Sequence, residues 1–320
     1  MNIPLLLTPA FKDYIWGGTK LRDIFNKKCN YEKIAESWEL SCHKDGNSII
    51  SNGEDAGKTL SQYIEKYGKS VLGTNCERFE NFPVLIKLID ARDNLSVQVH
   101  PDNEYALRVE GEYGKTEMWY IVDCEEDASL LYGFKKEISK EEFSQRIKNN
   151  TLLEVTNSVK VKKGDVFFIE SGTLHAIGKG ILIAEIQQNS NTTYRIYDYN
   201  RKDKDGKSRE LHIDKACEVT TLSPAAPPVN NEFTEYKGYR TKQLSSCEYF
   251  TTDIVETESY ASFCVLESSF EHILILDGNC VLGSDQYKDM RLEKGDSVFL
   301  PAGYGDFYID GKCTFIKTKI

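Results

Sequence analysis

The chain has 320 residues, of which 40% are hydrophobic and 28% charged, a composition typical of a globular protein long enough for two domains. Its formal net charge of −10 argues against nucleic acids and anionic membranes as partners, and it means that an anionic substrate needs a local cationic pocket. No apolar run reaches the length of a membrane-spanning helix, so we expect no membrane association.

The N-terminal sequence and the cysteine usage predict a cytoplasmic protein. The N-terminal stretch MNIPLLLTPAFKDY has only a short leucine run and no basic flank, so we do not expect a signal peptide. The nine cysteines are dispersed and form no C-x-x-C pair, which indicates reduced thiols that lie mostly in the core.

Short strands dominate the predicted secondary structure, with a few helical segments between them. In chain order, the expected helices are TLSQYIEKYG (59–68) and SKEEFSQRIKNN (139–150), both with capping-box spacing, and PDNEYALRVEG (101–111) between them. The expected strands are rich in Val, Ile, Phe and Tyr; they are FPVLIKLIDA (82–91), EMWYIVD (117–123), GDVFFIE (164–170), GILIAEIQQ (180–188), TTYRIYDY (192–199), HILILDG (272–278) and DSVFLPAG (296–303). The sequence therefore predicts a mostly β protein with short helical insertions.

A repeat divides the chain into two β units. KGDVFFIESGTLHAI (163–177) aligns with KGDSVFLPAGYGDFYI (294–309), and the upstream strands EMWYIVD and EHILILD are also similar. Between the copies, SPAAPPVNN (223–231) holds three of the eight prolines and is the best candidate for a linker. We therefore predict one domain over residues 1–228 and a second over residues 233–320.

Both copies resemble G-D-x4-P-x-G-x-x-H, the second signature of cupin barrels, and each departs from it at a different position. The first copy keeps the histidine, His175, but has Glu170 in place of the proline. The second copy keeps Pro301 but has Asp306 in place of the histidine. The resemblance implies a catalytic cupin domain, a jelly-roll-type β-barrel, followed by a degenerate cupin-like β domain without a metal site.

The stretch SVQVHPD (96–102) alternates like a strand that places a glutamine and a histidine on one face. Gln98 and His100 share this face, Val97 and Val99 point the other way, and a proline ends the strand. The polar face is either a solvent-facing edge or a pair of ligands directed into a cavity.

Other donors favour the cavity. His175 ends the SGTLH turn, and Glu117 begins the strand between the two histidines, so in a cupin-like barrel they would face the same cavity as His100. Taken singly, each histidine fits a hydrogen-bonded polar group at a strand end. Two imidazoles, a carboxylate and an amide oxygen together instead suit a divalent first-row metal with an open coordination position.

The segments SVQVHPD, GKTEMWY, SGTLHAIG and NTTYRIYDYNR, in this order, resemble the type I mannose-6-phosphate isomerases, in the short form common among low-GC Gram-positive bacteria. PAFKDYIWGGTKL and AESWELSCH resemble the same family, so the likeness covers most of residues 8–222. It implies a cytoplasmic cupin with one zinc per chain that interconverts mannose 6-phosphate and fructose 6-phosphate through an enediol. The implied metal ligands are Gln98, His100, Glu117 and His175.

The resemblance also implies catalytic residues. Arg195 matches the family's active-site arginine, and Lys87 and Lys115 match lysines of the pocket. A base that moves a proton between carbons works best with a pKa near the ambient pH, so a lysine whose pKa is lowered by burial or a neighbouring cation would serve, and the two lysines stay unranked. Arg195 suits a phosphate or a developing oxyanion because guanidinium is a planar fork. Asn191 departs from the family, which usually has aspartate there.

Two other functions fit a two-histidine, one-carboxylate cupin, namely an Fe(II) oxygenase and a metal-bearing sugar-phosphate sensor. Gln98 and the isomerase-like flanks disfavour the oxygenase, and the retained cationic residues disfavour the sensor.

The basic stretch RKDKDGKSR (201–209) has two interpretations. It either steers a sugar phosphate or forms a solvated turn at Asp205-Gly206, and we favour the turn. A small-molecule sugar phosphate is the expected partner, and the sequence gives no indication of the oligomeric state.

Overall fold

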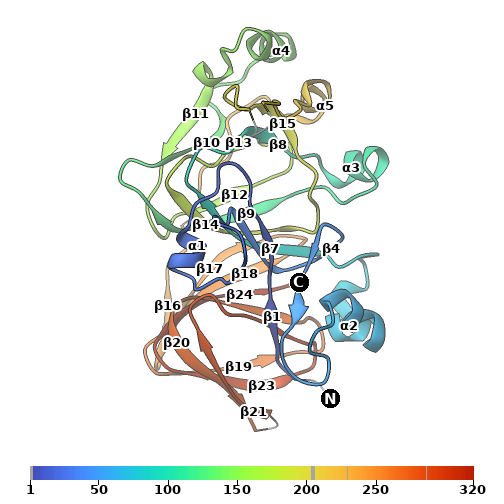
Figure 1. The fold of residues 1–320 in the computed structure, drawn as a ribbon, viewed down its shortest axis with the longest axis vertical. Helices are drawn as coiled ribbons and strands as arrows, with labels where there is room; N and C mark the ends of the chain where they lie inside the picture. The colour runs from blue at the N-terminus through green and yellow to red at the C-terminus, as the bar shows by residue number, and fades with distance from the viewer. Residues whose placement is uncertain (1–2, 203–205, 229, 286) are drawn as a thin grey trace.

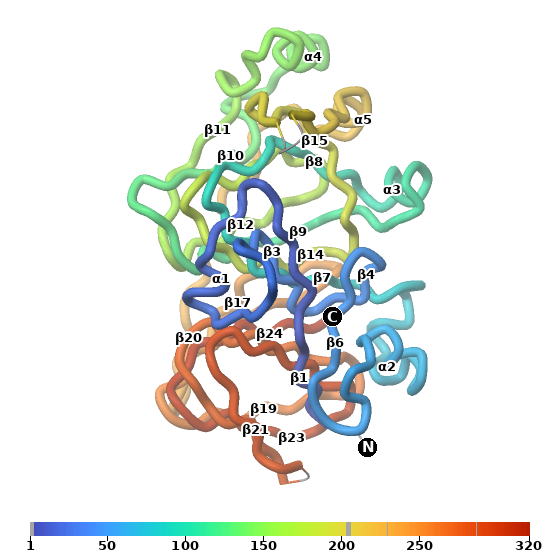
Figure 2. The backbone as a smooth tube through the Cα atoms, in the orientation of Figure 1, coloured from blue at the N-terminus to red at the C-terminus, as the bar shows by residue number. Residues whose placement is uncertain are grey.

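The computed structural model describes residues 3–202, 206–228, 230–285 and 287–320. Within these ranges, β-sheets are stacked along the longest axis of the molecule and helices lie on its outside (Figure 1). The backbone trace shows the N-terminal segment running between the upper half and the C-terminal, orange-red half (Figure 2). The predicted mostly β fold is confirmed. No helix among the described residues is both long and apolar enough to cross a bilayer.

The strands pair antiparallel and form the layers seen in Figure 1. The cavity sheet, as we name it, contains in spatial order β12 (Val166–Ile169), β9 (Glu117–Cys124), β14 (Ile181–Gln188), β7 (Val84–Ala91), β3 (Glu36–Leu40) and β2 (Ala10–Lys12). The outer sheet contains β11 (Thr156–Lys160), β10 (Ser129–Phe134), β13 (His175–Ala176), β8 (Val97–Val99) and β15 (Tyr194–Tyr197). The C-terminal sheet contains β16 (Thr234–Tyr236), β17 (Tyr239–Ser246), β18 (Thr251–Thr257), β24 (Cys313–Lys319), β20 (Glu271–Ser284), β22 (Ser297–Leu300), β1 (Leu5–Thr8) and β6 (Ile49–Ile50), with β19 (Tyr260–Val265), β21 (Tyr287–Glu293) and β23 (Gly305–Asp310) attached. A hairpin joins β4 (Cys42–His43) and β5 (Gly46–Asn47).

The helices follow local capping signals where these exist. They are α1 (Lys20–Asp23), α2 (Leu60–Tyr67), α3 (Asn103–Val109), α4 (Lys140–Lys148) and α5 (Ile213–Val219), with 3₁₀ turns at Lys69–Leu72, Thr74–Cys76 and Leu152–Glu154. The three predicted helices are confirmed: Thr59 and Gln62 form the capping box of α2, and Asp102 and Ser139 cap α3 and α4. Helices α1 and α5 were not predicted from the sequence, because neither has a side-chain cap.

The cavity sheet is buried on both faces. On one face, Ile86, Met118 and Ile186 belong to the same hydrophobic cluster as Phe299 and Ile316 of the C-terminal sheet. The opposite face is turned toward the outer sheet. The N-terminal strand β1 also joins the C-terminal sheet, because it pairs with β22. The division into residues 1–228 and 233–320 stays a prediction, and the two parts share one hydrophobic core.

Deletion of every residue after Pro228 is expected to give an insoluble or unstable protein. The deletion removes the sheet that covers Met118 and Ile186 and leaves β1 without β22, so an apolar face and an unpaired strand edge are exposed. Soluble yield and the thermal unfolding curve, measured beside the full-length chain, test this. A soluble truncated protein with a cooperative transition would contradict it.

The turn before α2 is held by a buried carboxylate. Asp55 is 4% exposed, and its oxygens lie 2.6 Å from Lys58 Nζ, 2.8 Å from Lys66 Nζ and 2.9 Å from the Tyr67 hydroxyl. Burial by itself would raise the pKa of this carboxyl, but the donors outweigh burial and hold the pKa well below its usual range.

Asp55→Asn is expected to lower the free energy of unfolding by about 1–3 kcal/mol at pH 7, because charge-assisted hydrogen bonds are lost in a buried place. A carboxyl whose folded pKa is depressed stabilises the fold above its unfolded pKa, and this contribution disappears as the pH falls through the folded pKa. The difference in the free energy of unfolding between the wild type and Asp55→Asn should therefore be steady above about pH 5 and shrink below about pH 4. Urea unfolding at a series of pH values measures it, and a difference that grows on acidification would refute the assignment.

Candidate metal centre and active site

Three polar side chains form a row across the outer sheet. Antiparallel pairing sets His175 on β13 opposite Gln98 on β8, and Gln98 opposite Arg195 on β15. Directly opposed residues on neighbouring strands share a face, so the three point to the same side of the sheet. Val97 and Val99 pack into the cluster on the other side. The alternation predicted for SVQVHPD is therefore confirmed.

The cavity sheet presents charged side chains to this row. Glu117 is the first residue of β9, and Glu185 on β14 lies opposite both Trp119 on β9 and Lys87 on β7. The Trp119 ring meets His175 edge-on, with ring centroids 5.2 Å apart. The polar faces of the two sheets are thus in contact.

His100, Glu117 and His175 converge between the two sheets. Their donor atoms lie within 4.8 Å of one another, and all three residues are buried. His175 Nε2 is 3.3 Å from one Glu117 oxygen, and His100 Nε2 is 3.7 Å from the other. Neither His100 Nε2 nor the two Glu117 oxygens have a hydrogen-bond partner among the described residues. Buried polar atoms are normally paired, so this group calls for a ligand.

Backbone carbonyls fix the tautomers of both histidines. His100 Nδ1 is 3.0 Å from the Thr192 carbonyl oxygen, and His175 Nδ1 is 2.8 Å from that of Thr173. A carbonyl requires an N–H donor, so Nδ1 carries the proton and Nε2 turns its lone pair to the centre. Burial and then the Lys115 cation hold the pKa of His100 well below its usual value, and burial lowers the pKa of His175 to about 4. Both rings are neutral, the state in which imidazole binds metals.

The donor set fits a divalent cation. Burial and then the Glu185 carboxylate raise the pKa of Glu117 to about 8, although the Lys115 and Lys87 cations oppose this rise. A bound cation would further favour the charged carboxylate. Two neutral imidazoles and a carboxylate suit a first-row metal such as zinc. Gln98 is adjacent, with its side-chain nitrogen 3.3 Å from His175 Nε2.

The two predicted lysines have different partners. Lys115 Nζ lies 3.2 Å from a Glu117 oxygen. Lys87 Nζ lies 3.0 Å from Glu185 and 3.8 Å from Glu36. Burial alone would lower the pKa of Lys87, but the Glu185 and Glu36 carboxylates outweigh burial and raise it above its ordinary value. The expectation of a lowered lysine pKa is therefore wrong for Lys87.

Arg195 lies in a cationic neighbourhood at the end of the row. Its Nη1 donates to the Glu210 carbonyl oxygen at 2.9 Å, and its buried Nε has no hydrogen-bond partner in the described parts of the chain. Burial and then Arg209 lower the pKa of Arg195. Arg209 itself binds Asp198, with Nε 2.8 Å from Oδ2, as does Arg201. The ends of the 201–209 stretch are thus held by ion pairs, and Asp205 of the expected turn lies outside the described residues.

Comparisons with known proteins agree with this geometry. A family model described as phosphomannose isomerase type I, catalytic domain, matches residues 5–118, and one described as mannose-6-phosphate isomerase, cupin domain, matches residues 240–320. The chain is 41% identical to the probable mannose-6-phosphate isomerase GmuF of Bacillus subtilis, over 99% of both chains. The chain belongs to the type I phosphomannose isomerase family. The mannose-6-phosphate isomerase of Streptococcus mutans is 37% identical to it, over 99% of this chain and 98% of the relative.

Solved structures of similar proteins have the same fold. The mannose 6-phosphate isomerase from Bacillus subtilis covers 100% of both chains at 38% identity with a TM-score of 0.93. A mannosephosphate isomerase described as putative, from Archaeoglobus fulgidus, is 20% identical and reaches a TM-score of 0.77, over 100% of this chain and 97% of that chain, which shows the shared fold. The predicted family and cupin fold class are confirmed.

Two carboxylates beside this candidate site were not predicted from the sequence. Glu185 accepts a hydrogen bond from Trp119 Nε1 at 2.8 Å, and Glu36 accepts one from Trp38 Nε1 at 2.7 Å, while both face Lys87. A signal was present in each case, because a lone glutamate interrupts the apolar strand ILIAEIQQ and another begins ESWEL. Charged residues inside fully buried strands are rare unless they are paired or functional.

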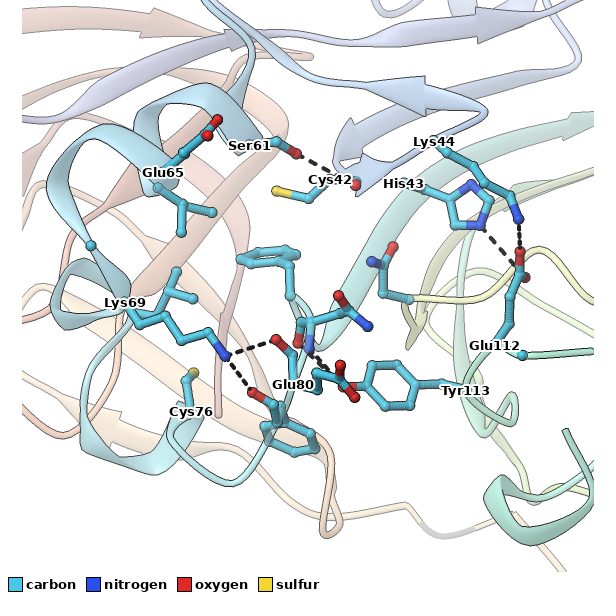
Figure 3. A pocket seen from close by; sticks show the side chains of 18 residues that line it. Cys42, His43, Lys44, Ser61, Glu65, Lys69, Cys76, Glu80, Glu112 and Tyr113 are labelled. Atoms are coloured by element: carbon cyan, nitrogen blue, oxygen red, sulfur yellow. Dashed lines mark hydrogen bonds and ion pairs between the residues drawn. The ribbon is translucent and has the colours of Figure 1, made fainter. Parts of the chain in front are cut away.

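The departure from the phosphomannose isomerase pattern at Asn191 has a structural counterpart. The Asn191 side-chain nitrogen donates to Asp45 Oδ2 at 2.9 Å, so a carboxylate from the turn between β4 and β5 adjoins the position. A cleft of about 620 Å³ lies beyond this hairpin, between α2, the 3₁₀ turn Lys69–Leu72 and residues 111–113 (Figure 3). His43 and Glu112, 3.6 Å apart, form one side of it. None of the seven predicted site residues lines this cleft.

Proposed function

We propose that the chain is a metal-dependent isomerase that interconverts mannose 6-phosphate and fructose 6-phosphate, with one zinc ion as its metal. The observation that carries the proposal is the convergence of His100 Nε2, His175 Nε2 and the Glu117 carboxylate in a buried site. The full-length similarity to proteins named mannose-6-phosphate isomerase supports the substrate.

The proposed metal ligands are His100, Glu117 and His175, with Gln98 as a fourth. The tautomers of the two histidines support their assignment, because both Nε2 lone pairs face the centre. An amide binds a cation through its oxygen, so the assignment of Gln98 requires that its oxygen, rather than its nitrogen, faces His175.

Aldose–ketose isomerisation takes a proton from C2 and returns one to C1 through an enediol, while the hydroxyl proton passes from O2 to O1. A bound zinc ion supplies Lewis-acid polarisation of the sugar oxygens. Lys115 is the better candidate for the base, because it adjoins Glu117 at 3.2 Å and has no second carboxylate among its ion pairs in the described residues. Lys87 contacts two carboxylates that favour its charged form, and its proposed role is to hold Glu185 in place.

Arg195 is proposed to bind the phosphate or to stabilise negative charge on the enediolate. The unpartnered Nε and the nearby Arg209 support an anion-binding role, since guanidinium pairs with oxyanions through several N–H groups. A cytoplasmic location is part of the proposal, and the free thiols of all nine cysteines in the described structure support it.

A coupled assay for fructose 6-phosphate formation from mannose 6-phosphate tests the proposal. We expect activity that a chelator abolishes and added zinc restores, equally in air and under anaerobic conditions. Binding of mannose 6-phosphate without conversion would favour a sensor instead. Conversion that depends on oxygen would favour an Fe(II) oxygenase.

A further inference from the structure

The cavity sheet carries a buried glutamine, Gln187, on the strand next to Glu117. Gln187 is 0% exposed and lies on β14, directly opposite Glu117 on β9. Side chains in such a pair share a face of the sheet, with Cβ atoms roughly 4.5–5.5 Å apart. Gln187 therefore adjoins the three-residue donor group.

Two backbone carbonyls determine the orientation of its amide. The side-chain nitrogen donates to the carbonyl oxygen of Gln188 at 2.8 Å and to that of Ser190 at 2.6 Å. Only the NH₂ end of a carboxamide bonds to two carbonyls, so the amide cannot turn over without losing both bonds. The remaining atom, Oε1, is buried and has no hydrogen-bond partner among the residues that the structure describes.

The neighbouring residue shows that this strand does satisfy a buried amide where no ligand is needed. Gln188 Oε1 accepts from the Thr116 N–H at 2.9 Å, and Gln188 Nε2 donates to Asn103 Oδ1 at 2.9 Å. A buried acceptor without a partner costs free energy, and a ligand with a donor group removes that cost. The unpaired Oε1 of Gln187 is thus a fixed acceptor beside the reaction centre.

We propose that Gln187 Oε1 accepts a hydrogen bond from a hydroxyl group of the bound sugar chain, and that it thereby positions the substrate and selects for a hydroxyl there. The inference rests on the proposed function. Lys115, Lys87 and Arg195 are donors only, and the Glu117 carboxylate is assigned to the cation. The hydroxyl groups of a sugar are also hydrogen-bond donors. Gln187 Oε1 supplies an acceptor for one of them, which the three cationic side chains and the carboxylate assigned to the cation do not.

The test measures how Gln187 and individual hydroxyl groups depend on each other. Mannitol 6-phosphate, an open-chain alcohol that cannot isomerise, and its 3-deoxy, 4-deoxy and 5-deoxy forms are titrated calorimetrically into the zinc-loaded wild type and the Gln187→Met variant. Removal of the hydroxyl that Gln187 binds should weaken binding roughly tenfold in the wild type and less than about twofold in Gln187→Met. Equal losses in both proteins for all three deoxy compounds would overturn the inference.

Controls separate this role from structural and metal-binding roles. Gln188→Met is the matched control, because both ends of that amide have partners within the protein; it should lower thermal stability and leave the tenfold loss in place. Gln187→Leu, a second apolar replacement of similar size, should also reduce the loss to less than about twofold, and it covers the case in which Gln187→Met fails to fold. Zinc affinity of Gln187→Met, measured by chelator competition, should stay within about threefold of the wild type. A tenfold or larger loss of zinc affinity without hydroxyl dependence would assign the oxygen to the cation site and overturn the inference.

Failure of this inference is distinguishable from failure of the proposed function. A wild type that turns over mannose 6-phosphate but loses the same affinity as Gln187→Met for every deoxy compound refutes the role of Gln187 alone. A wild type that neither turns over mannose 6-phosphate nor binds mannitol 6-phosphate refutes the proposed function and this inference together.

Discussion

Replacement of His175 by alanine is expected to remove most of the bound zinc and to lower turnover of mannose 6-phosphate by roughly 10³-fold or more, the factor that matches the several kcal/mol a Lewis acid supplies. His175 contributes one of the converging donors, and its Nδ1 is held by the Thr173 carbonyl, so the remaining donors cannot replace it. The fold should survive, because His175 belongs neither to the hydrophobic cluster between the two sheets nor to the cluster on the other face of the outer sheet. Zinc content by atomic absorption and the coupled assay measure both effects.

Asp306→Ala is the matched control for this experiment. Asp306 stands at the position of the second copy that corresponds to His175, but it is exposed on β23. We expect zinc content and turnover of this variant to equal those of the wild type, at one zinc per chain. Stoichiometric zinc in His175→Ala would refute the ligand assignment, and two zinc ions per wild-type chain or an inactive, folded Asp306→Ala variant would refute the interpretation of the repeat.

Arg195→Lys is expected to raise the activation barrier by about 2–4 kcal/mol although the positive charge is kept. The Glu210 carbonyl anchors Nη1 and leaves Nε free for an anion, and a single ammonium group cannot make both contacts. Steady-state kinetics with mannose 6-phosphate measure the loss. Values of kcat/KM within about threefold of the wild type would rule out a contact with the reacting sugar phosphate, because that factor is below 1 kcal/mol.

Inhibition by inorganic phosphate distinguishes the two proposed roles of Arg195. If the guanidinium binds the phosphate group, the inhibition constant and KM should both rise in Arg195→Lys. If it stabilises charge that develops during the reaction, kcat should fall while phosphate inhibition stays unchanged.

Local sequence patterns predicted much of the fold because they act within a single element. The period of two in SVQVHPD placed Gln98 and His100 on one face, and the capping box at Thr59 located the start of α2. Helix α5 was missed because the residue that precedes it, His212, provides no side-chain cap. The position of β1 in the C-terminal sheet was also missed, since four residues near the N-terminus carry no information about a partner almost 300 residues away.

Residue identity and short-range spacing were enough to predict the donor types of the candidate metal site and the family to which the chain belongs. The carboxylates that face Lys87 and raise its pKa became visible only in three dimensions, as did the position of Gln187 opposite Glu117 with an oxygen that has no partner among the described residues. Both results depend on the register between strands that are far apart in the chain. A shift of one residue would turn each of these side chains to the other face of the sheet.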